Sequence, residues 1–131
     1  MGIGEIRFWD CITVRDLEAM TAFLTALGFT EHAAYRDEAD PSLVAHAEWV
    51  SPDGHGGLMF GSEREDAVGS SRVGTAGIYL VVDDPDAVFE AALAAGGTVV
   101  QPMQDQGYGG RGGTVADPDG NQWSFGDYQP H

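Results

Sequence analysis

The sequence repeats itself at a nearly constant interval, and this repeat constrains the fold more than any other feature. Residues 14–19 (VRDLEA) correspond to residues 82–87 (VDDPDA), 68 positions later (82 − 14). Residues 51–54 (SPDG) correspond to residues 117–120 (DPDG) at an interval of 66 (117 − 51). Both of the latter segments have the proline and glycine of a tight turn. We therefore interpret the chain as two copies of one structural unit.

Each copy predicts one helix after its first strand. Asp16 is a candidate N-cap, and apolar residues then recur at helical spacing as far as Gly28. In the second copy Asp84 takes the cap position and Pro85 the first helical position. Gly96 ends this second run, again 68 positions (96 − 28) after its counterpart. The two helices therefore begin and end with the same signals.

Runs typical of β-strands surround both helices. They are predicted at residues 6–14, 29–35, 43–50 and 57–61, and again at residues 75–82, 98–101, 112–116 and 121–125. Each copy is then a βαβββ module, about residues 1–61 and 75–131, and a polar Gly/Ser-rich linker at residues 62–74 joins the two. One sheet with one helix cannot bury both sheet faces. We predict a single α+β domain in which the modules form a curved mixed sheet around a central cavity.

This arrangement resembles the vicinal oxygen chelate superfamily, which includes glyoxalase I, bleomycin resistance proteins and extradiol dioxygenases. The resemblance rests on the duplication, on a Val-x-Asp start to each helix, on residues 27–29 (LGF) and on residues 117–121 (DPDGN). Residues 108–128 look most like the glyoxalase-like and bleomycin-resistance-like branch. The resemblance implies fold more closely than function, because this fold hosts unrelated activities. It also implies a homodimer, since a second chain commonly completes the cavities of this family.

In metal-using members of this superfamily, four inward residues bind a divalent ion, one each from the first and last strands of both modules. The resemblance places these positions at Trp9, Met59, Gly77 and Ser124. None of the four offers the imidazole or carboxylate that those members use. Slipping each strand by one residue would add only Asp10 as a ligand. We therefore expect no metal and no other cofactor.

His46 and Glu48 are the candidates for acid–base catalysis. They lie two positions apart on one predicted strand, so their side chains share a face. A weak metal pair is one interpretation, and cross-strand hydrogen bonding or a polar contact in the pocket is the favoured one. Asp10 and Tyr79 are further groups that a dry cavity could tune. The sequence contains no nucleophile elbow and no cysteine motif.

Without a metal, the cavity is expected to be an apolar cup with aromatic walls that binds the ligand. Strand alternation puts Trp9 and Cys11 on one face, with Gly77 and Tyr79 as their counterparts in the second module. Gly77 opposite Trp9 leaves space for a flat molecule beside the indole, and Met59 adds a polarizable wall.

Some of the candidate residues admit two interpretations. Trp49 is a candidate for ligand binding, although a place in the core is favoured for both Trp49 and Trp123. Cys11, the only cysteine, fits a small buried hydrophobe better than a nucleophile.

The glycine-rich residues 107–113 predict a mobile loop at the cavity mouth. Tyr108 would be its lid, and Arg111 would be either an anion anchor or, as favoured, a structural partner of Asp117.

The charge balance excludes two classes of partner. Six arginines and no lysine stand against 21 acidic residues, a formal net charge of −15. Such a surface repels phosphate backbones and anionic membranes, so neither nucleic acid nor a membrane is expected. The charge serves either solubility or the concentration of cationic small molecules. No apolar run approaches the length of a membrane span and no signal peptide is recognised, so we expect a cytoplasmic protein.

Two functions from different classes remain open at this point. The first is metal-independent binding or sequestration of a small aromatic or cationic molecule, as in bleomycin resistance proteins. The second is a metal-independent lyase, isomerase or cyclase that uses acid–base side chains. A true metalloenzyme is the least favoured. The sequence does not decide whether the protein is an enzyme.

Overall fold

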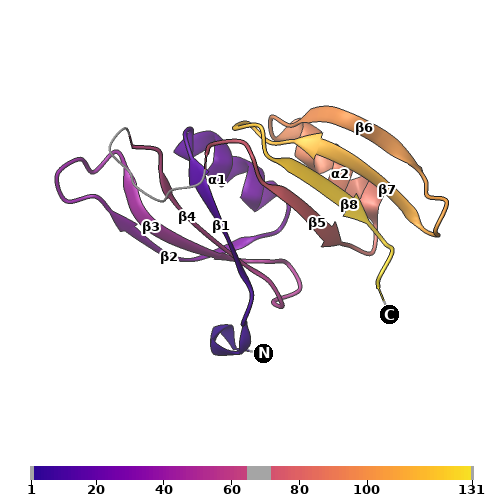
Figure 1. Ribbon diagram of the computed structural model, residues 1–131, viewed down its shortest axis with the longest axis horizontal. Coiled ribbons are helices and arrows are strands. Elements are labelled where there is room, and N and C mark those ends of the chain that lie inside the picture. The colour runs from indigo at the N-terminus through magenta and orange to yellow at the C-terminus, as the bar shows by residue number, and fades with distance from the viewer. Residues whose placement is uncertain (1, 65–71, 131) are drawn as a thin grey trace.

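The computed structural model describes residues 2–64 and 72–130. It consists of two modules with the same order of elements, preceded by a short 3₁₀-helix (Figure 1). In chain order the elements are η1 (Ile3–Glu5), β1 (Trp9–Val14), α1 (Leu17–Ala26), β2 (Thr30–Arg36), β3 (Val44–Val50), β4 (Gly57–Ser62), β5 (Gly77–Val81), α2 (Pro85–Ala94), β6 (Thr98–Asp105), β7 (Arg111–Ala116) and β8 (Gln122–Gly126). This order confirms the predicted α+β class with two βαβββ modules.

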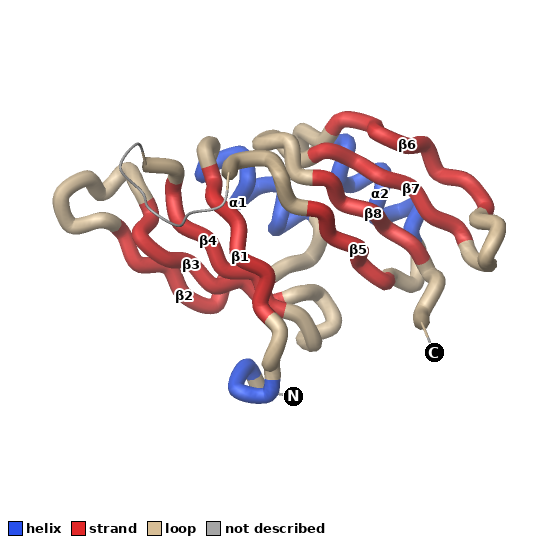
Figure 2. The backbone as a smooth tube through the Cα atoms, viewed as in Figure 1, coloured by secondary structure: helices blue, strands red, loops and turns tan. Residues whose placement is uncertain are grey.

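Each module forms its own four-stranded mixed sheet. The strand orders are β1-β4-β3-β2 and β5-β8-β7-β6. The first and last strands of each module pair in parallel, and the remaining pairs are antiparallel. Figure 2 shows the two sheets side by side, with both helices behind them. They remain two separate sheets, because β1 and β5 are edge strands that are not hydrogen-bonded to each other.

The register of the strands confirms the internal repeat. Cys11 pairs with Met59 in the first sheet, and Tyr79 pairs with Ser124 in the second. Cys11 and Tyr79 are 68 positions apart (79 − 11). Met59 and Ser124 therefore occupy equivalent places, although the interval between them is 65 (124 − 59).

The helix ends follow their sequence signals. The side chains of Asp16 and Asp84 each accept a hydrogen bond from the backbone N–H three residues further on, at 3.1 and 3.2 Å. Gly28 and Gly96 follow the two helices with φ of 93° and 100°, a conformation that glycine adopts without the steric cost of a Cβ. No helix in residues 2–64 and 72–130 has the length and hydropathy to cross a membrane.

Some element boundaries differ from the expected ones. The first strand begins at Trp9 rather than at residue 6, since η1 precedes it. β6 continues to Asp105, past Pro102, because it is an outer strand with a register shift where the proline lies. β4 includes Ser62, and residues 65–71 of the expected linker lie outside the described residues.

One hydrophobic core joins the two modules. Trp123 of β8 is fully buried, and its ring contacts Phe23 of α1 and Phe29 at centroid distances of 5.9 and 5.6 Å. A polar contact adds to this packing. The Asp119 carboxylate accepts hydrogen bonds from the backbone N–H groups of Arg15 (2.8 Å) and Asp16 (3.1 Å). A side chain of the second module therefore holds the N-terminal end of the helix of the first.

Candidate functional site

Each sheet packs one face against its helix, and in the described residues no helix covers the other face (Figure 1). On this uncovered face of the first module, Cys11, Met59 and Glu48 form a row across three strands. Trp9 lies flat over Gly57 on the neighbouring strand, so that a Cβ at Gly57 would overlap the indole ring. Cys11 is exposed rather than buried. The face therefore offers an indole, a thioether and a thiol to a ligand or a partner chain.

His46 and Glu48 meet on the same face. His46 Nε2 and Glu48 Oε2 are 2.8 Å apart, and the side chains are 42% and 28% exposed. The His46 ring also stacks on Tyr35 of β2, with centroids 6.3 Å apart. Glu48 can thus orient the imidazole, as the orienting carboxylate of an acid–base pair does.

The uncovered face of the second module has a different character. Ser124 Oγ lies 2.8 Å from Thr114 Oγ1, so the serine hydroxyl is engaged with a neighbouring strand. The Tyr79 ring lies over Gly126, and its hydroxyl donates to the backbone oxygen of Tyr128 at 2.8 Å. Gly77 has open space where a side chain would be.

The Tyr79 phenol is a donor rather than a base. Burial, with the neighbouring Tyr108 as a further cause, raises the pKa of Tyr79 above its usual value. The hydroxyl therefore stays protonated near neutral pH.

The glycine-rich segment forms the turn between β6 and β7. Tyr108 is 63% exposed there, and its ring contacts Tyr128 edge to face at 4.9 Å. Arg111 makes a forked pair with Asp86, with both distances 2.9 Å, and a second pair with Asp105 at 3.3 Å. Arg111 thus has two structural partners, the carboxylates of Asp86 and Asp105.

The expectation that Asp117 pairs with Arg111 is wrong. Asp117 is 4% exposed, and its Oδ1 accepts hydrogen bonds from the backbone N–H groups of residues 119, 120 and 121. Its Oδ2 accepts from Asn121 Nδ2 and Trp123 Nε1, each at 2.9 Å. Both oxygens of the carboxylate therefore accept hydrogen bonds from residues 119–123, and Asp117 is not the partner of Arg111.

Trp49 belongs to the core, which is the favoured interpretation from the sequence. It is 3% exposed and stacks on Phe60 at 6.5 Å, on the helix-facing side of the first sheet. We therefore remove Trp49 from the candidate ligand-binding residues.

A cleft of about 550 Å³ lies between the two modules. Its walls combine aromatic and aliphatic groups with acidic ones. The lining residues are Phe8, Asp10, Phe29, Ser51, Asp53, His55, Gly56, Gly57, Leu58, Gly77, Ile78, Tyr79, Leu80, Val81, Trp123 and Gln129. Gly77 and Tyr79 are in this set, whereas Trp9, Met59 and Ser124 are not. The candidate residues predicted from the sequence are therefore divided between this cleft and the uncovered faces of the sheets.

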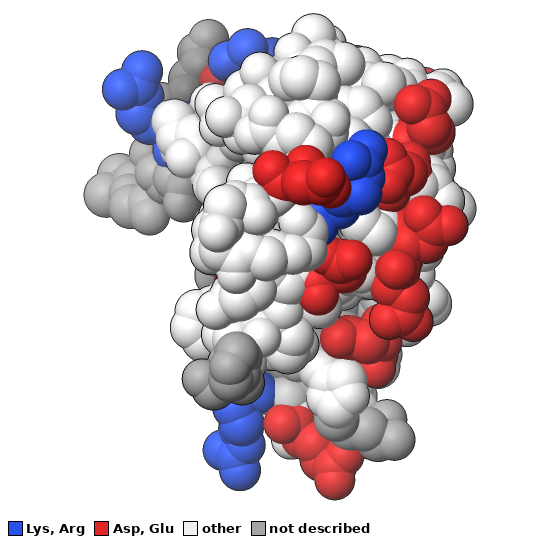
Figure 3. Space-filling model, turned by 90° about the vertical axis from the view of Figure 1, so that its right-hand side faces the viewer, with Lys and Arg blue, Asp and Glu red and all other residues white. Residues whose placement is uncertain are grey.

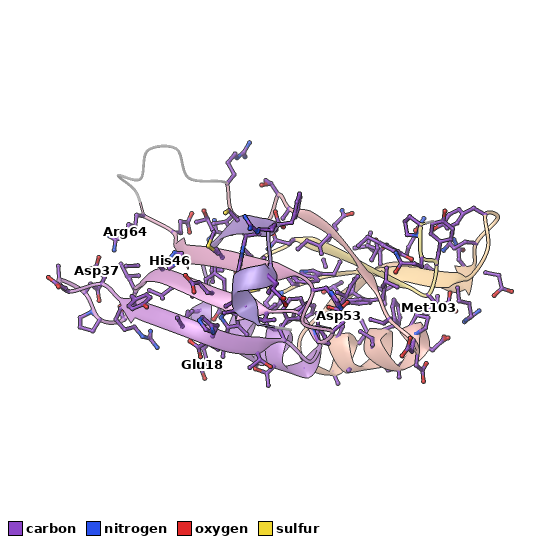
Figure 4. The ribbon with its side chains drawn as sticks, turned by 90° about the horizontal axis from the view of Figure 1, so that it is seen from below. Glu18, Asp37, His46, Asp53, Arg64 and Met103 are labelled. Atoms are coloured by element: carbon purple, nitrogen blue, oxygen red, sulfur yellow. The ribbon has the colours of Figure 1, made fainter. Side chains whose placement is uncertain are left out.

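The sequence did not indicate that Phe8, Asp53 and His55 line a cleft. Phe8 precedes β1 and is 82% exposed, and the sequence of residues 51–54 predicts only a turn. Figure 4 shows Asp53 near the middle of the molecule, between the two modules. The only available signal was the repeat itself, in which this turn corresponds to the one at residues 117–120.

Two hydrogen bonds fix the Asp53 carboxylate. Its Oδ1 accepts from Ser51 Oγ at 2.6 Å and from the backbone N–H of His55 at 2.9 Å. Partial burial would raise the pKa of Asp53, but these hydrogen bonds outweigh burial and the net pKa lies below its usual value. Asp53 is therefore anionic at neutral pH.

The residues at the four family metal positions do not fit a metal ion. They are Trp9, Met59, Gly77 and Ser124, and the single hydroxyl among them is bonded to Thr114. Within residues 2–64 and 72–130, no group of three or more His, Cys, Asp or Glu side chains is placed to hold a metal.

Comparisons with known proteins agree with this architecture. A segment of 49 residues is 55% identical to an uncharacterized protein of Mycobacterium bovis, and it covers 37% of this chain and 32% of that protein. The chain thus matches about a third of the length of this curated relative. The crystal structure of TioX from Micromonospora sp. ML1 superposes with a TM-score of 0.73 at 23% identity, over 94% of this chain and 98% of that one.

A second structure and a family model complete the comparison. A glyoxalase/bleomycin resistance protein from Catenulispora acidiphila DSM 44928 superposes with a TM-score of 0.64 at 25% identity, over 95% of this chain and 100% of that one. The sequence model of the Glyoxalase/Bleomycin resistance protein/Dioxygenase superfamily matches residues 2–125. The chain therefore belongs to the glyoxalase/bleomycin resistance protein/dioxygenase superfamily.

Proposed function

We propose that the protein binds a small aromatic or cationic organic molecule without a metal ion, as a bleomycin-resistance-like member of its superfamily. The observation that carries this proposal is the cleft between the modules. Its volume of about 550 Å³ is that of a typical small-molecule site. The aromatic residues Phe8 and Tyr79 line it, and both are exposed in the protein alone.

The walls of the cleft suit a flat ligand. Each ring–ring contact contributes about 0.5–1.5 kcal/mol beyond the burial of apolar area. Phe8 and Tyr79 are 82% and 42% exposed, so a ligand between the modules would remove apolar surface from water. The open space at Gly77 leaves room for the ligand beside Tyr79.

Calorimetric titration of a panel of aromatic compounds tests this proposal. The protein is first dialysed against EDTA, and the titration is repeated with added zinc, nickel or manganese. We expect at least one compound to bind equally well in both conditions. Absence of binding by every compound, or binding only after metal is added, would contradict the proposal.

We also propose that the protein is a homodimer. Each module leaves one sheet face uncovered by a helix, and these faces include Cys11 and Tyr35, both exposed in the single chain. A second copy could cover such faces and complete a cavity over them. Sedimentation equilibrium should give twice the chain mass, and a monomer mass across the accessible concentration range would refute the dimer.

The contact between His46 and Glu48 favours a second candidate function, a metal-independent lyase, isomerase or cyclase. General acid–base catalysis by a positioned side chain contributes about 10²- to 10⁴-fold to a rate. Proton exchange at carbon next to a carbonyl, followed by NMR in D₂O, detects such a base without knowledge of the natural substrate. Exchange that survives EDTA and disappears in Glu48→Gln would support an enzyme, and no exchange with any carbonyl compound would count against it.

A further inference from the structure

We propose that the ligand of the cleft is an organic cation, an amine attached to an aromatic ring system, whose charge is held by Asp10 and Asp53. The inference rests on the proposed function and names the ligand class of that site. It combines three properties of the cleft, namely its charge, the fixed position of one carboxylate and the nature of its walls.

The charge of the lining is negative. Two carboxylates, Asp10 and Asp53, face the cleft together with His55, and none of the described lining residues is an arginine. Within the described part of the chain, the Asp10 carboxylate makes no hydrogen bond or ion pair with another residue, although Asp10 is only partly exposed. The Asp10 and Asp53 carboxylates would attract a cation in the cleft and repel an anion.

The position of the Asp53 carboxylate is fixed by hydrogen bonds within its own turn. Ser51 Oγ and the His55 N–H hold its Oδ1, so that the carboxylate does not need to be ordered when a ligand binds. The turn that carries it lies between the modules (Figure 4). In the equivalent turn of the second module, the corresponding carboxylate of Asp119 is used to hold the backbone of Arg15 and Asp16. In the first module the corresponding group is left to face the cleft.

The walls favour an organic rather than an inorganic cation. The aromatic residues Tyr79 and Phe8 and the partly exposed aliphatic residues Ile78 and Leu80 line the cleft, and a hydrated metal ion would not use them. A cation beside an aromatic face gains about 0.5 to 2 kcal/mol in proteins, a contribution additional to that of the carboxylates. The apolar part of the ligand would occupy the space beside Gly77, where a Cβ atom would meet no other atom within 4 Å.

The charge of the whole protein acts in the same direction. The formal net charge is −15, and Figure 3 shows acidic side chains gathered along one side of the end formed by the second module. Such a field raises the local concentration of cations and their rate of association. It does not by itself locate a site, so the test below separates the field from the two carboxylates.

The test uses three probes that share one ring system and differ in charge. They are 1-naphthylmethylammonium, the neutral 1-naphthylmethanol and the anionic 1-naphthoate, each titrated calorimetrically into EDTA-treated protein at pH 7. We expect the ammonium compound to bind about tenfold or more tightly than the alcohol, and the anion to bind most weakly.

Variants then locate the site and the charge. Gly77→Phe should weaken the ammonium compound about tenfold or more by filling the cleft, because Gly77 has space for a side chain and no positive φ. Its matched control is Val99→Phe on the outer strand β6, where Val99 is 47% exposed, and this variant should bind as the wild type does. Asp10→Asn and Asp53→Asn should each weaken the ammonium compound about fivefold to tenfold and leave the alcohol unchanged.

Glu90→Gln, on the exposed surface of α2, removes the same charge outside the lining of the cleft and should change affinity less than about twofold. Unchanged affinity for the alcohol shows that each Asp variant is folded.

The outcomes distinguish the two proposals. If the ammonium compound and the alcohol bind equally well and both are lost in Gly77→Phe, the cleft binds ligands but the charge inference is wrong. If Glu90→Gln weakens binding as much as Asp53→Asn, the general field and not the two carboxylates selects the cation, which also overturns the inference. If none of the three probes binds to wild-type protein, both this inference and the aromatic-ligand proposal fail for this ring class.

Discussion

The two modules share one backbone plan but use equivalent positions differently. The row of Cys11, Met59 and Glu48 in the first module corresponds to Tyr79, Ser124 and Thr114 in the second. The first row contains a thiol, a thioether and a carboxylate that bonds His46, whereas two hydroxyls bond each other in the second row. The repeated backbone therefore does not impose a repeated chemistry.

The two turns show the same divergence. The second turn is organised by Asp117, which satisfies five donors and fixes Trp123 in the core. The first turn has Ser51 at the equivalent position, with fewer hydrogen bonds, and Leu58 where the second module has Trp123. The second turn stabilises the packing of the modules, and the first borders the cleft. This difference gives a set of experiments on matched positions.

The largest effect is expected from removal of the two turn-initiating side chains. Asp117→Ala leaves the indole N–H of Trp123 and the amide of Asn121 buried without acceptors, and should lower the free energy of unfolding by about 3 to 4 kcal/mol. Ser51→Ala removes hydrogen bonds to Gly56 and Asp53 and should cost about 1 kcal/mol. Urea denaturation measures the free energy of unfolding of both variants. Equal decreases would show that the two turns stabilise the protein to the same extent.

A smaller effect is expected from two glycines that differ in their surroundings. Gly57→Ala forces the Trp9 indole away from the strand and should destabilise the protein by about 1–3 kcal/mol, with a shift in tryptophan emission. Gly77→Ala adds a methyl group in open space and should change stability by less than about 0.5 kcal/mol. A large loss in Gly77→Ala would mean that the cleft is closed in solution.

The smallest effect is expected on the pH dependence of stability. It concerns Asp53 and Asp119, which are the third residues of the turns at residues 51–54 and 117–120. Hydrogen bonds outweigh burial and lower the pKa of Asp53, so its contribution to stability is present above its unfolded pKa and is lost as pH falls through the folded pKa. Burial raises the pKa of Asp119 despite hydrogen bonds from Arg15 and Asp16, so its contribution is present at low pH and is lost as pH rises through the folded pKa.

Urea denaturation between pH 3 and pH 7 should therefore give opposite slopes for the two amide variants. Relative to wild type, Asp53→Asn should become less stable as pH rises, and Asp119→Asn more stable. Each change should stay below about 1 kcal/mol because both groups are partly solvated. Slopes of the same sign would remove the proposed difference between the two turns.

The sequence predicted the elements of the fold because their signals are local. The caps at Asp16 and Asp84 and the glycines that end the helices depend only on neighbouring residues, and the repeat fixes how the two copies correspond. The extension of β6 past Pro102 was missed because only its position at the edge of a sheet permits it.

The site was predicted less completely than the fold. Strand alternation correctly put Trp9 and Cys11 on one face, but the cleft is formed by the packing of one module on the other. Which residues line it depends on the angle between the sheets, which no local pattern encodes. Phe8, outside any strand, and Asp53, in a turn, could be placed there only from the structure.

A crystal structure of the protein with bound 1-naphthylmethylammonium, grown in the presence of EDTA, tests the account most directly. We expect the naphthalene ring beside Gly77 and Tyr79, and the ammonium group within hydrogen-bonding distance of Asp10 or Asp53. A ligand bound only on the uncovered sheet faces would contradict this account. So would a metal ion retained among Trp9, Met59, Gly77 and Ser124.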